Sequence, residues 1–374
     1  MSVLINGTDG IDFNDGSNQS TAATPYARKN LIINGDMRIA QRGTSTSGQT
    51  TGGYTVDRFR TAFSGRDEAV WTDSQTTDVP SGEGFSNSFK VEMTTAETSM
   101  DTGTTEYFTV EHRMEGQHFQ HLSYGTASAK KLTLSFWVKS SVTGTLAVSL
   151  YNVDSTRVIG STYTINATNT WEKKTITFDG DTVGTLDNDN NQSLGLRWFL
   201  GAANGVTSAD NTTWQSYVTT NFAYGHATNA IPETSGATWQ ITGVQLEVGD
   251  SASDFEFVPY DMELARCQRY YENFGTEDDH YFTGAVACSS STRCRIGITY
   301  NQKRTAPTIT VGNTDLTVFT GATNITSTAV VVGSAVTTKS AFLQIDVASG
   351  LTSGQSELLK TNNTSNPVQI DAEL

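Results

Sequence analysis

The sequence predicts an all-β protein made of two β units that one short helix joins. The chain has 374 residues with 33 Gly but only 6 Pro, and charged residues make up 17% of it. Its polar surface is therefore built mainly from Thr, Ser, Asn and Gln, a composition typical of β-rich proteins. From Asn30 onward, apolar runs of strand length alternate with clusters of turn residues, and only the stretch 258–274 has helical spacing.

Residues 1–29 differ from the rest of the chain. They are polar and rich in Gly, Asp and Asn, with isolated apolar residues such as Leu4, Ile5 and Ile11. So few apolar side chains cannot build a core, and we expect an N-terminal arm that becomes ordered against a partner.

Residues 30–258 are predicted to form a β-sandwich. In the run KLTLSFWVKS, the face expected in the core carries Leu132, Leu134, Phe136 and Val138. Trp137 lies on the opposite face of this strand. In SLGLRWFLG, Trp198 shares a face with three leucines, whereas Arg197 and Phe199 face the other way. Repeated short strands with turn signals between them are typical of a sandwich.

A linking helix is predicted over residues 259–274. Asp261 can cap its first turn, and an apolar stripe with spacings of three and four is formed by Leu264, Cys267, Tyr271 and Phe274. The stripe either packs on the preceding sandwich or contacts copies of itself. The second alternative is our hypothesis for a trimer-packing helix.

Residues 275–374 are predicted to form a smaller distal β-sandwich domain, because about 100 residues with this β-branched content can build one. The three cysteines cannot all pair within one chain, and we expect reduced thiols, although Cys288 and Cys294 could face each other across a hairpin. Residues 1–23 show no basic and apolar pattern of an export signal and the sequence has no run of about 18 apolar residues, so we expect neither export by such a signal nor membrane insertion.

The charge distribution argues against nucleic-acid binding. The formal net charge is −15, and no run of basic residues interrupts the acidic background. No nucleophile elbow or phosphate-binding loop is present, and the acidic clusters look like solvated turns. We therefore expect a binding protein that is not an enzyme and has no cofactor.

Several stretches resemble bacteriophage tail fibre and related virion receptor-binding proteins. These are INGTDGIDFNDGSNQSTAA in the arm, NLIINGDMRIAQRGTS and YTVDRFR at the sandwich entry, and WQITGVQLEVGDSASDFEFVPYDMELARCQRYYENF at its exit, with QIDAEL in the distal domain. The resemblance implies a jelly-roll sandwich akin to carbohydrate-binding modules. It also implies a homotrimer on a phage tail, made in the cytoplasm of a host bacterium, whose arm (1–29) docks on a tail or capsid protein and which binds host surface polysaccharide.

The resemblance also bears on calcium. In many carbohydrate-binding modules of this shape, an NGDM-type opening and an Asp on the last strand hold a structural calcium. Here Thr242 stands near that Asp position, which leaves Asp36 as the one candidate ligand and argues against calcium.

Glycan binding uses aromatic faces for stacking on sugar rings. Trp137 lies on the polar face of its strand, and Trp214 and Tyr217 follow a polar loop, so these three are our candidates for glycan contacts. Trp71, Trp198 and Trp239 are expected in the core. Two rival functions stay open: a structural virion component such as a capsid fibre or tail adaptor, and a glycan-cleaving tail enzyme with paired carboxylates.

Overall fold

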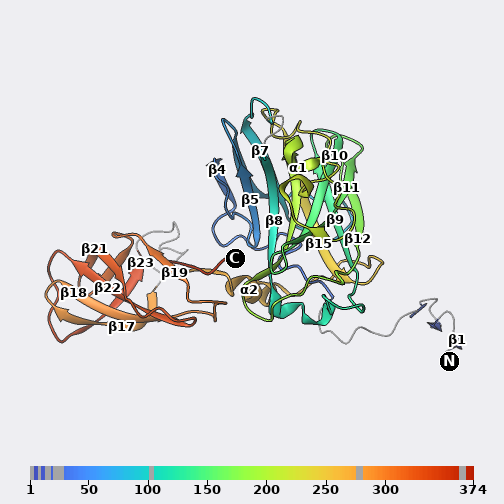
Figure 1. Cartoon of the computed structure of the whole chain (residues 1–374). Coiled ribbons are helices and arrows are strands. Elements are labelled where there is room, and N and C mark those ends of the chain that lie inside the picture. The colour runs from blue at the N-terminus through green and yellow to red at the C-terminus, as the bar shows by residue number, and fades with distance from the viewer. Residues whose placement is uncertain are drawn as a thin grey trace.

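Two β units with a short helix between them make up most of the protein (Figure 1). The computed structural model describes residues 29–100, 105–274, 281–361 and 368–374. Of the arm it describes three short strands that form one sheet, β1 (Leu4–Asn6), β2 (Gly10–Asp12) and β3 (Asn18–Gln19). The all-β prediction is confirmed. Among the described residues, neither α-helix is long and apolar enough to cross a membrane.

The larger unit is a sandwich of two six-stranded antiparallel sheets. The first, here called the β13 sheet, has the order β14 (Gln215–Ser216), β11 (Arg157–Ile165), β10 (Gly144–Asn152), β13 (Gln192–Ala202), β8 (Tyr107–Glu115) and β5 (Phe59–Ser64). The second, the β9 sheet, has the order β12 (Glu172–Phe178), β9 (Leu132–Ser140), β15 (Thr238–Val248), β7 (Ser88–Thr95), β6 (Val70–Thr76) and β4 (Ser45–Gln49). Short helices lie in the connections: η1 (Gly116–His118), η2 (Gln120–Leu122), α1 (Asn204–Thr207) and η3 (Thr219–Asn221).

The core lies between the two sheets and follows the predicted alternation. The inward side chains of β9 are fully buried, and Trp71, Trp198 and Trp239 are buried with them. Because adjacent residues of a strand point to opposite faces, this arrangement leaves Trp137 on the outer face of the β9 sheet. The same rule places Arg197 on the outer face of the β13 sheet.

The smaller unit contains a closed six-stranded barrel, a closure that the prediction of a smaller β-sandwich did not specify. The barrel order is β17 (Tyr281–Ser290), β18 (Arg293–Thr299), β22 (Ser340–Val347), β21 (Asn324–Val332), β20 (Leu316–Phe319) and β23 (Ser356–Thr361). Beside it lies a sheet of β16 (Tyr271–Phe274), β24 (Val368–Asp371) and β19 (Thr308–Val311). The two sets of strands share one apolar core.

A disulfide joins Cys288 and Cys294, which are directly opposed on the β17–β18 hairpin with Cα atoms 4.0 Å apart. The expectation of reduced thiols is wrong for this pair, and the hairpin alternative is confirmed. Cys267 is a free, buried thiol, and burial raises its pKa well above the usual value.

The linking helix is shorter than predicted. The helix α2 spans Tyr260–Gln268, and Pro259 at its N-cap makes no side-chain capping bond, so the proposed Asp261 cap is wrong. Tyr271 and Phe274 belong to strand β16. The helix predicted over 259–274 therefore ends too late in the chain. Residues 271–274 are extended because pairing with β24 satisfies their backbone hydrogen bonds.

Two of the four residues of the predicted trimer-packing stripe are buried within the single chain, and Leu264 and Phe274 are half-buried. Cys267 and Tyr271 are no more than 1% exposed. Leu264 and Cys267 pack on Ile33 and Ile39 of the sandwich, whereas Phe274 packs against the core of the distal unit. Leu264 and Cys267 thus pack on the sandwich, as the first alternative predicts, whereas Phe274 packs on the distal unit.

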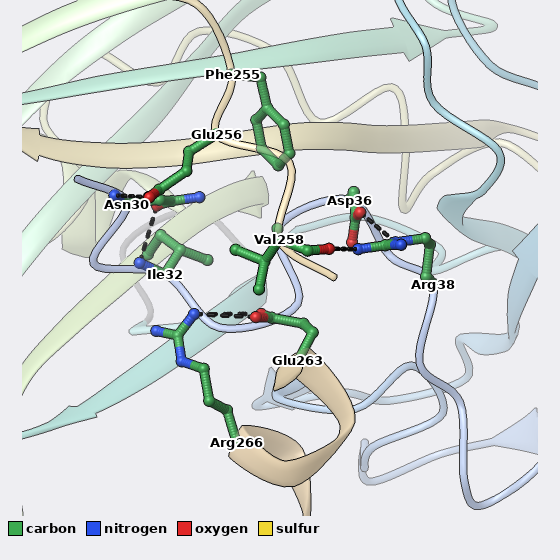
Figure 2. Close-up of a pocket in the computed structure, with 10 residues that line it drawn as sticks. Asn30, Ile32, Asp36, Arg38, Phe255, Glu256, Val258, Glu263 and Arg266 are labelled. Atoms are coloured by element: carbon green, nitrogen blue, oxygen red, sulfur yellow. Dashed lines mark hydrogen bonds and ion pairs between the residues drawn. The ribbon is translucent and has the colours of Figure 1, made fainter. Parts of the chain in front are cut away.

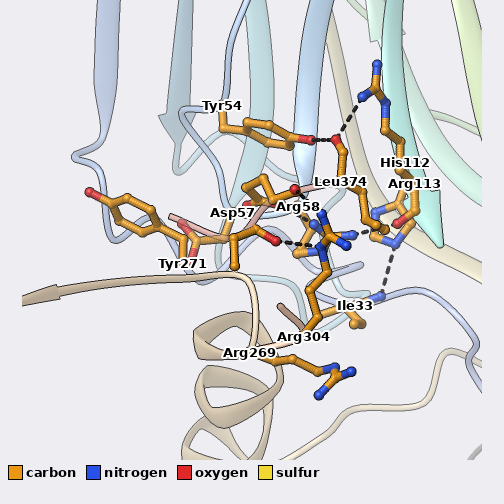
Figure 3. Close-up of polar contacts among 12 residues, drawn as sticks. Ile33, Tyr54, Asp57, Arg58, His112, Arg113, Arg269, Tyr271, Arg304 and Leu374 are labelled. Atoms are coloured by element: carbon orange, nitrogen blue, oxygen red, sulfur yellow. Dashed lines mark hydrogen bonds and ion pairs between the residues drawn. The ribbon is translucent and has the colours of Figure 1, made fainter. Parts of the chain in front are cut away.

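Residues 371–374 return to the sandwich and fix the junction between the two units (Figure 3). Arg58, 1% exposed, forms an ion pair with Glu373, and its Cζ lies 3.5 Å from the centroid of the Tyr270 ring. Arg304 donates to the carbonyl oxygens of Ala372 and Glu373 at 2.6 and 2.7 Å. Since both units contribute side chains to this buried network, it holds them in one arrangement.

Candidate functional site

A patch of charged and aromatic side chains covers part of the outer face of the β13 sheet. Strand alternation places Glu111 on β8, Arg197 on β13 and Tyr151 on β10 outward, because their chain neighbours face the core. The strand register then sets Arg60 of β5 and Arg197 of β13 directly opposite Glu111. We use the name β13 outer patch for this row, Arg113 and the adjacent rings. The rings are those of Tyr107, Tyr151, Tyr217 and Phe222.

Three guanidinium groups converge on the Glu111 carboxylate. Arg197 Nε lies 3.1 Å from Oε1, Arg60 Nη1 lies 3.5 Å from Oε2, and Arg113 reaches Oε2 with Nε at 3.1 Å and Nη2 at 3.0 Å. Burial alone would raise the pKa of Glu111, but the charges of Arg197, Arg113 and Arg60 outweigh it and hold the pKa below its usual value. Glu111 is therefore ionised at neutral pH, unlike the general acid of a glycosidase.

Aromatic rings form a wall beside this row. The connection from Ala203 to Ala223 folds over one end of the sheet and brings Tyr217 and Phe222 to Tyr151, with Tyr217 centred 5.2 Å from both rings. The guanidinium carbon of Arg197 lies 5.0 Å from the centroids of both Tyr151 and Phe222. Tyr107, also half-buried, packs against Phe222 at 5.3 Å.

This arrangement suits a sugar ligand. Half-exposed tyrosines offer ring faces and hydroxyl groups, and fixed guanidinium groups offer donors to sugar oxygens. Predicted residue Tyr217 belongs to this wall, whereas the other two predicted aromatics, Trp137 and Trp214, lie elsewhere. The structure thus separates the three candidates.

Trp137 lines a hollow of about 190 Å³ on the outer face of the β9 sheet. Three phenylalanines, Phe85, Phe255 and Phe257, pack beside it with ring centroids 4.9 to 5.3 Å apart. A β-bulge at Gly243 makes room for this cluster, since a Cβ there would lie 2.6 Å from Phe85. Glu83, Lys173 and Asp254 also line this hollow, so it places charged groups beside the rings.

Trp214 lines a separate hollow of about 440 Å³ with Lys131, Arg157 and the exposed Val183. Its indole N–H donates to the Asp179 carbonyl oxygen at 2.6 Å. One side of the indole packs on the sandwich core, so this ring is a wall of the hollow and is fixed in place.

Asp36 lies in a small hollow of about 10 Å³, room for about one water molecule (Figure 2). Its carboxylate pairs with Arg38, while Glu263 pairs with Arg266 at 3.0 Å. Burial raises the pKa of Asp36, and Arg38 only partly offsets this effect. A site already held by a guanidinium group does not fit calcium, and the described residues contain no group of three His, Cys, Asp or Glu side chains placed to hold a metal.

Sequence reasoning missed most of the β13 outer patch. The alternation in SLGLRWFLG already placed Arg197 outward, but only the strand register shows that Arg60 and Glu111 lie beside it. It also missed Trp171, whose indole N–H donates to Asp78 at 3.2 Å; the alternation around β12 would have placed this ring on the face that carries Trp137.

No protein-family model and no curated protein matches the chain. Among solved structures, it is similar to the enzymatically active domain of tailspike protein 4 of bacteriophage CBA120, with a TM-score of 0.33 and 13% identity over 59% of this chain and 21% of that one. It is also similar to a CBM4 structure, with a TM-score of 0.31, 12% identity and coverage of 58% and 99%. A family 11 carbohydrate-binding module from Clostridium thermocellum gives a TM-score of 0.28, 12% identity and coverage of 56% and 98%. The chain thus spans about a fifth of the tailspike chain that it matches, and nearly all of the two modules.

Proposed function

We propose that this protein is a virion adhesin of the bacteriophage tail fibre type that binds host surface glycans on the β13 outer patch. The observation that carries the proposal is the row of Arg60, Glu111 and Arg197 beside the half-exposed Tyr151 and Tyr217. Donors and acceptors in a fixed row next to aromatic rings are what recognition of a sugar requires. The phage context rests on the sequence stretches that resemble tail fibres.

The proposed assembly is a homotrimer that docks on the virion through residues 1–29. Side chains of this arm, apart from Lys29, lie outside the described residues. Since Cys267 and Tyr271 are buried in the single chain, we propose that surfaces other than these two side chains hold the trimer. Several weak sites on one particle would gain roughly 10² to 10⁴ in avidity, which suits adhesion without turnover.

Binding of the purified full-length protein to host and non-host cells tests the proposal. We expect host-selective binding that soluble host polysaccharide removes and that blocks phage adsorption. Absence of host-selective binding would favour the structural virion component. Shortening of the polysaccharide during incubation would favour the glycan-cleaving enzyme.

A further inference from the structure

We propose that the β13 outer patch recognises a carboxylate-bearing saccharide, such as a uronate or sialate polymer. This inference rests on the proposed function, because it names the ligand class of the same surface. Three guanidinium groups surround the single carboxylate of Glu111, so the row itself carries an excess of positive charge. A planar guanidinium group matches a carboxylate with two parallel hydrogen bonds.

Neighbouring contacts decide which cations remain for a ligand. Arg113 donates from Nη1 to an oxygen of Leu374 at 2.7 Å and from Nε and Nη2 to Glu111. Its three guanidinium nitrogens therefore already have partners within the chain. Glu115, the next outward carboxylate on β8, accepts from Arg269 at 2.7 and 2.8 Å, so this pair adds no net charge. Arg60 and Arg197 therefore supply the excess.

Arg60 is the more accessible of these two cations. Its side chain is 28% exposed, against 12% for Arg197, and its one polar side-chain contact among the described residues is the 3.5 Å ion pair with Glu111. The remaining guanidinium donors of this partly exposed side chain are thus available to an anion. Glu111 occupies the position between the two guanidinium groups, so a saccharide bound on the Tyr151 ring, 5.0 Å from Arg197, would place its carboxylate on the free side of Arg60.

The local excess of positive charge stands out because the chain as a whole is strongly negative. At a net charge of −15, the protein repels an acidic polymer at long range. At physiological ionic strength this repulsion is screened over about 8 Å, so a short-range cationic site can still bind an acidic sugar. A neutral sugar would need no such excess.

A glycan array with the full-length protein tests the inference. The array carries uronate-, sialate- and phosphate-bearing glycans, neutral glycans, and carboxyl-reduced forms of the acidic glycans. The variants are Arg60→Gln, the rescue Arg60→Lys, and the control Lys90→Gln. Lys90 lies on the outer face of the opposite sheet, pairs with Glu92 at 2.5 Å and has a 27% exposed side chain, so the control removes an equally exposed cation.

We expect carboxylate-bearing glycans to bind, and their reduced forms to bind about tenfold more weakly or not at all. R60Q should weaken binding of the acidic glycans about tenfold, R60K should recover part of it, and K90Q should match the wild type. Binding of neutral or phosphate-bearing glycans in place of carboxylate-bearing ones would overturn the inference and leave the proposed function standing. Equal loss of binding in R60Q and K90Q would do the same. No binding to any glycan would overturn both.

Discussion

The buried pair of Arg58 and Glu373 predicts a strong coupling between the two units. Glu373→Ala would leave the Arg58 guanidinium, 1% exposed, without its carboxylate. Burial alone would lower the pKa of Arg58, but Glu373 outweighs burial and raises it, which shows how closely this cation depends on its partner. Breaking a buried pair by removing one partner costs about 3–5 kcal/mol.

Urea unfolding followed by tryptophan fluorescence measures this effect. All 6 Trp lie between residues 71 and 239, so the signal reports the sandwich while the substitution lies in the distal segment. Asp346→Ala is the control, because Asp346 pairs with Arg293 through two hydrogen bonds at the surface of the barrel. An exposed pair contributes at most about 1 kcal/mol.

A double variant separates lost pairing from lost packing. Arg58→Met with Glu373→Leu removes both charges together, and we expect it to be less destabilised than E373A. An E373A loss no larger than that of D346A would refute the reasoning, because it would mean that Arg58 is not desolvated by the junction.

Four further predictions concern the sandwich, the thiols and the assembly. Burial raises the pKa of Asp73 to about 7, so the folded state keeps a proton that the unfolded state releases near pH 4, and stability falls as pH rises through this window. Between pH 5 and 8 the wild type should lose about 2–3 kcal/mol relative to Asp73→Asn in urea unfolding; parallel curves would contradict this. Gly243→Ala should lower the melting temperature, because residue 243 has a φ of 61° and the added Cβ would lie 2.6 Å from Phe85. An unchanged melting temperature would show that the bulge relaxes freely. Thiol titration should find none in the folded protein, one (Cys267) in denaturant and three after reduction, and three without reductant would exclude the disulfide. Light scattering should show a trimer at micromolar concentration, and a monomer would remove that part of the proposal.

The predictions that followed strand alternation were confirmed. Period-two patterns specify which face of a strand is buried, so the core positions of β9 and β13 could be assigned from the sequence. The end of α2 could not, because Tyr271 and Phe274 fit a helical stripe equally well. Their extended conformation depends on β24, about 100 residues further along the chain.

The β13 outer patch, too, depends on contacts between distant segments that the local sequence pattern does not predict. Single strands identify Arg197 and Tyr151 as outward residues, but the patch exists only because β5, β8, β13 and β10 are neighbours in one sheet. Strand order is a property of the whole fold, and local pattern does not encode it. Strand face and loop position therefore directed attention to Trp137 and Trp214, which lie on other surfaces.

Calorimetric titration of host polysaccharide fragments into two variants tests the central claim most directly. Tyr151→Ala removes the ring between Arg197 and Tyr217, whereas Trp137→Ala removes the ring in the hollow of the β9 sheet. We predict that Y151A lowers the affinity about tenfold or more while W137A binds like the wild type. Loss of binding in W137A with full affinity in Y151A would contradict the account and move the site to the opposite sheet.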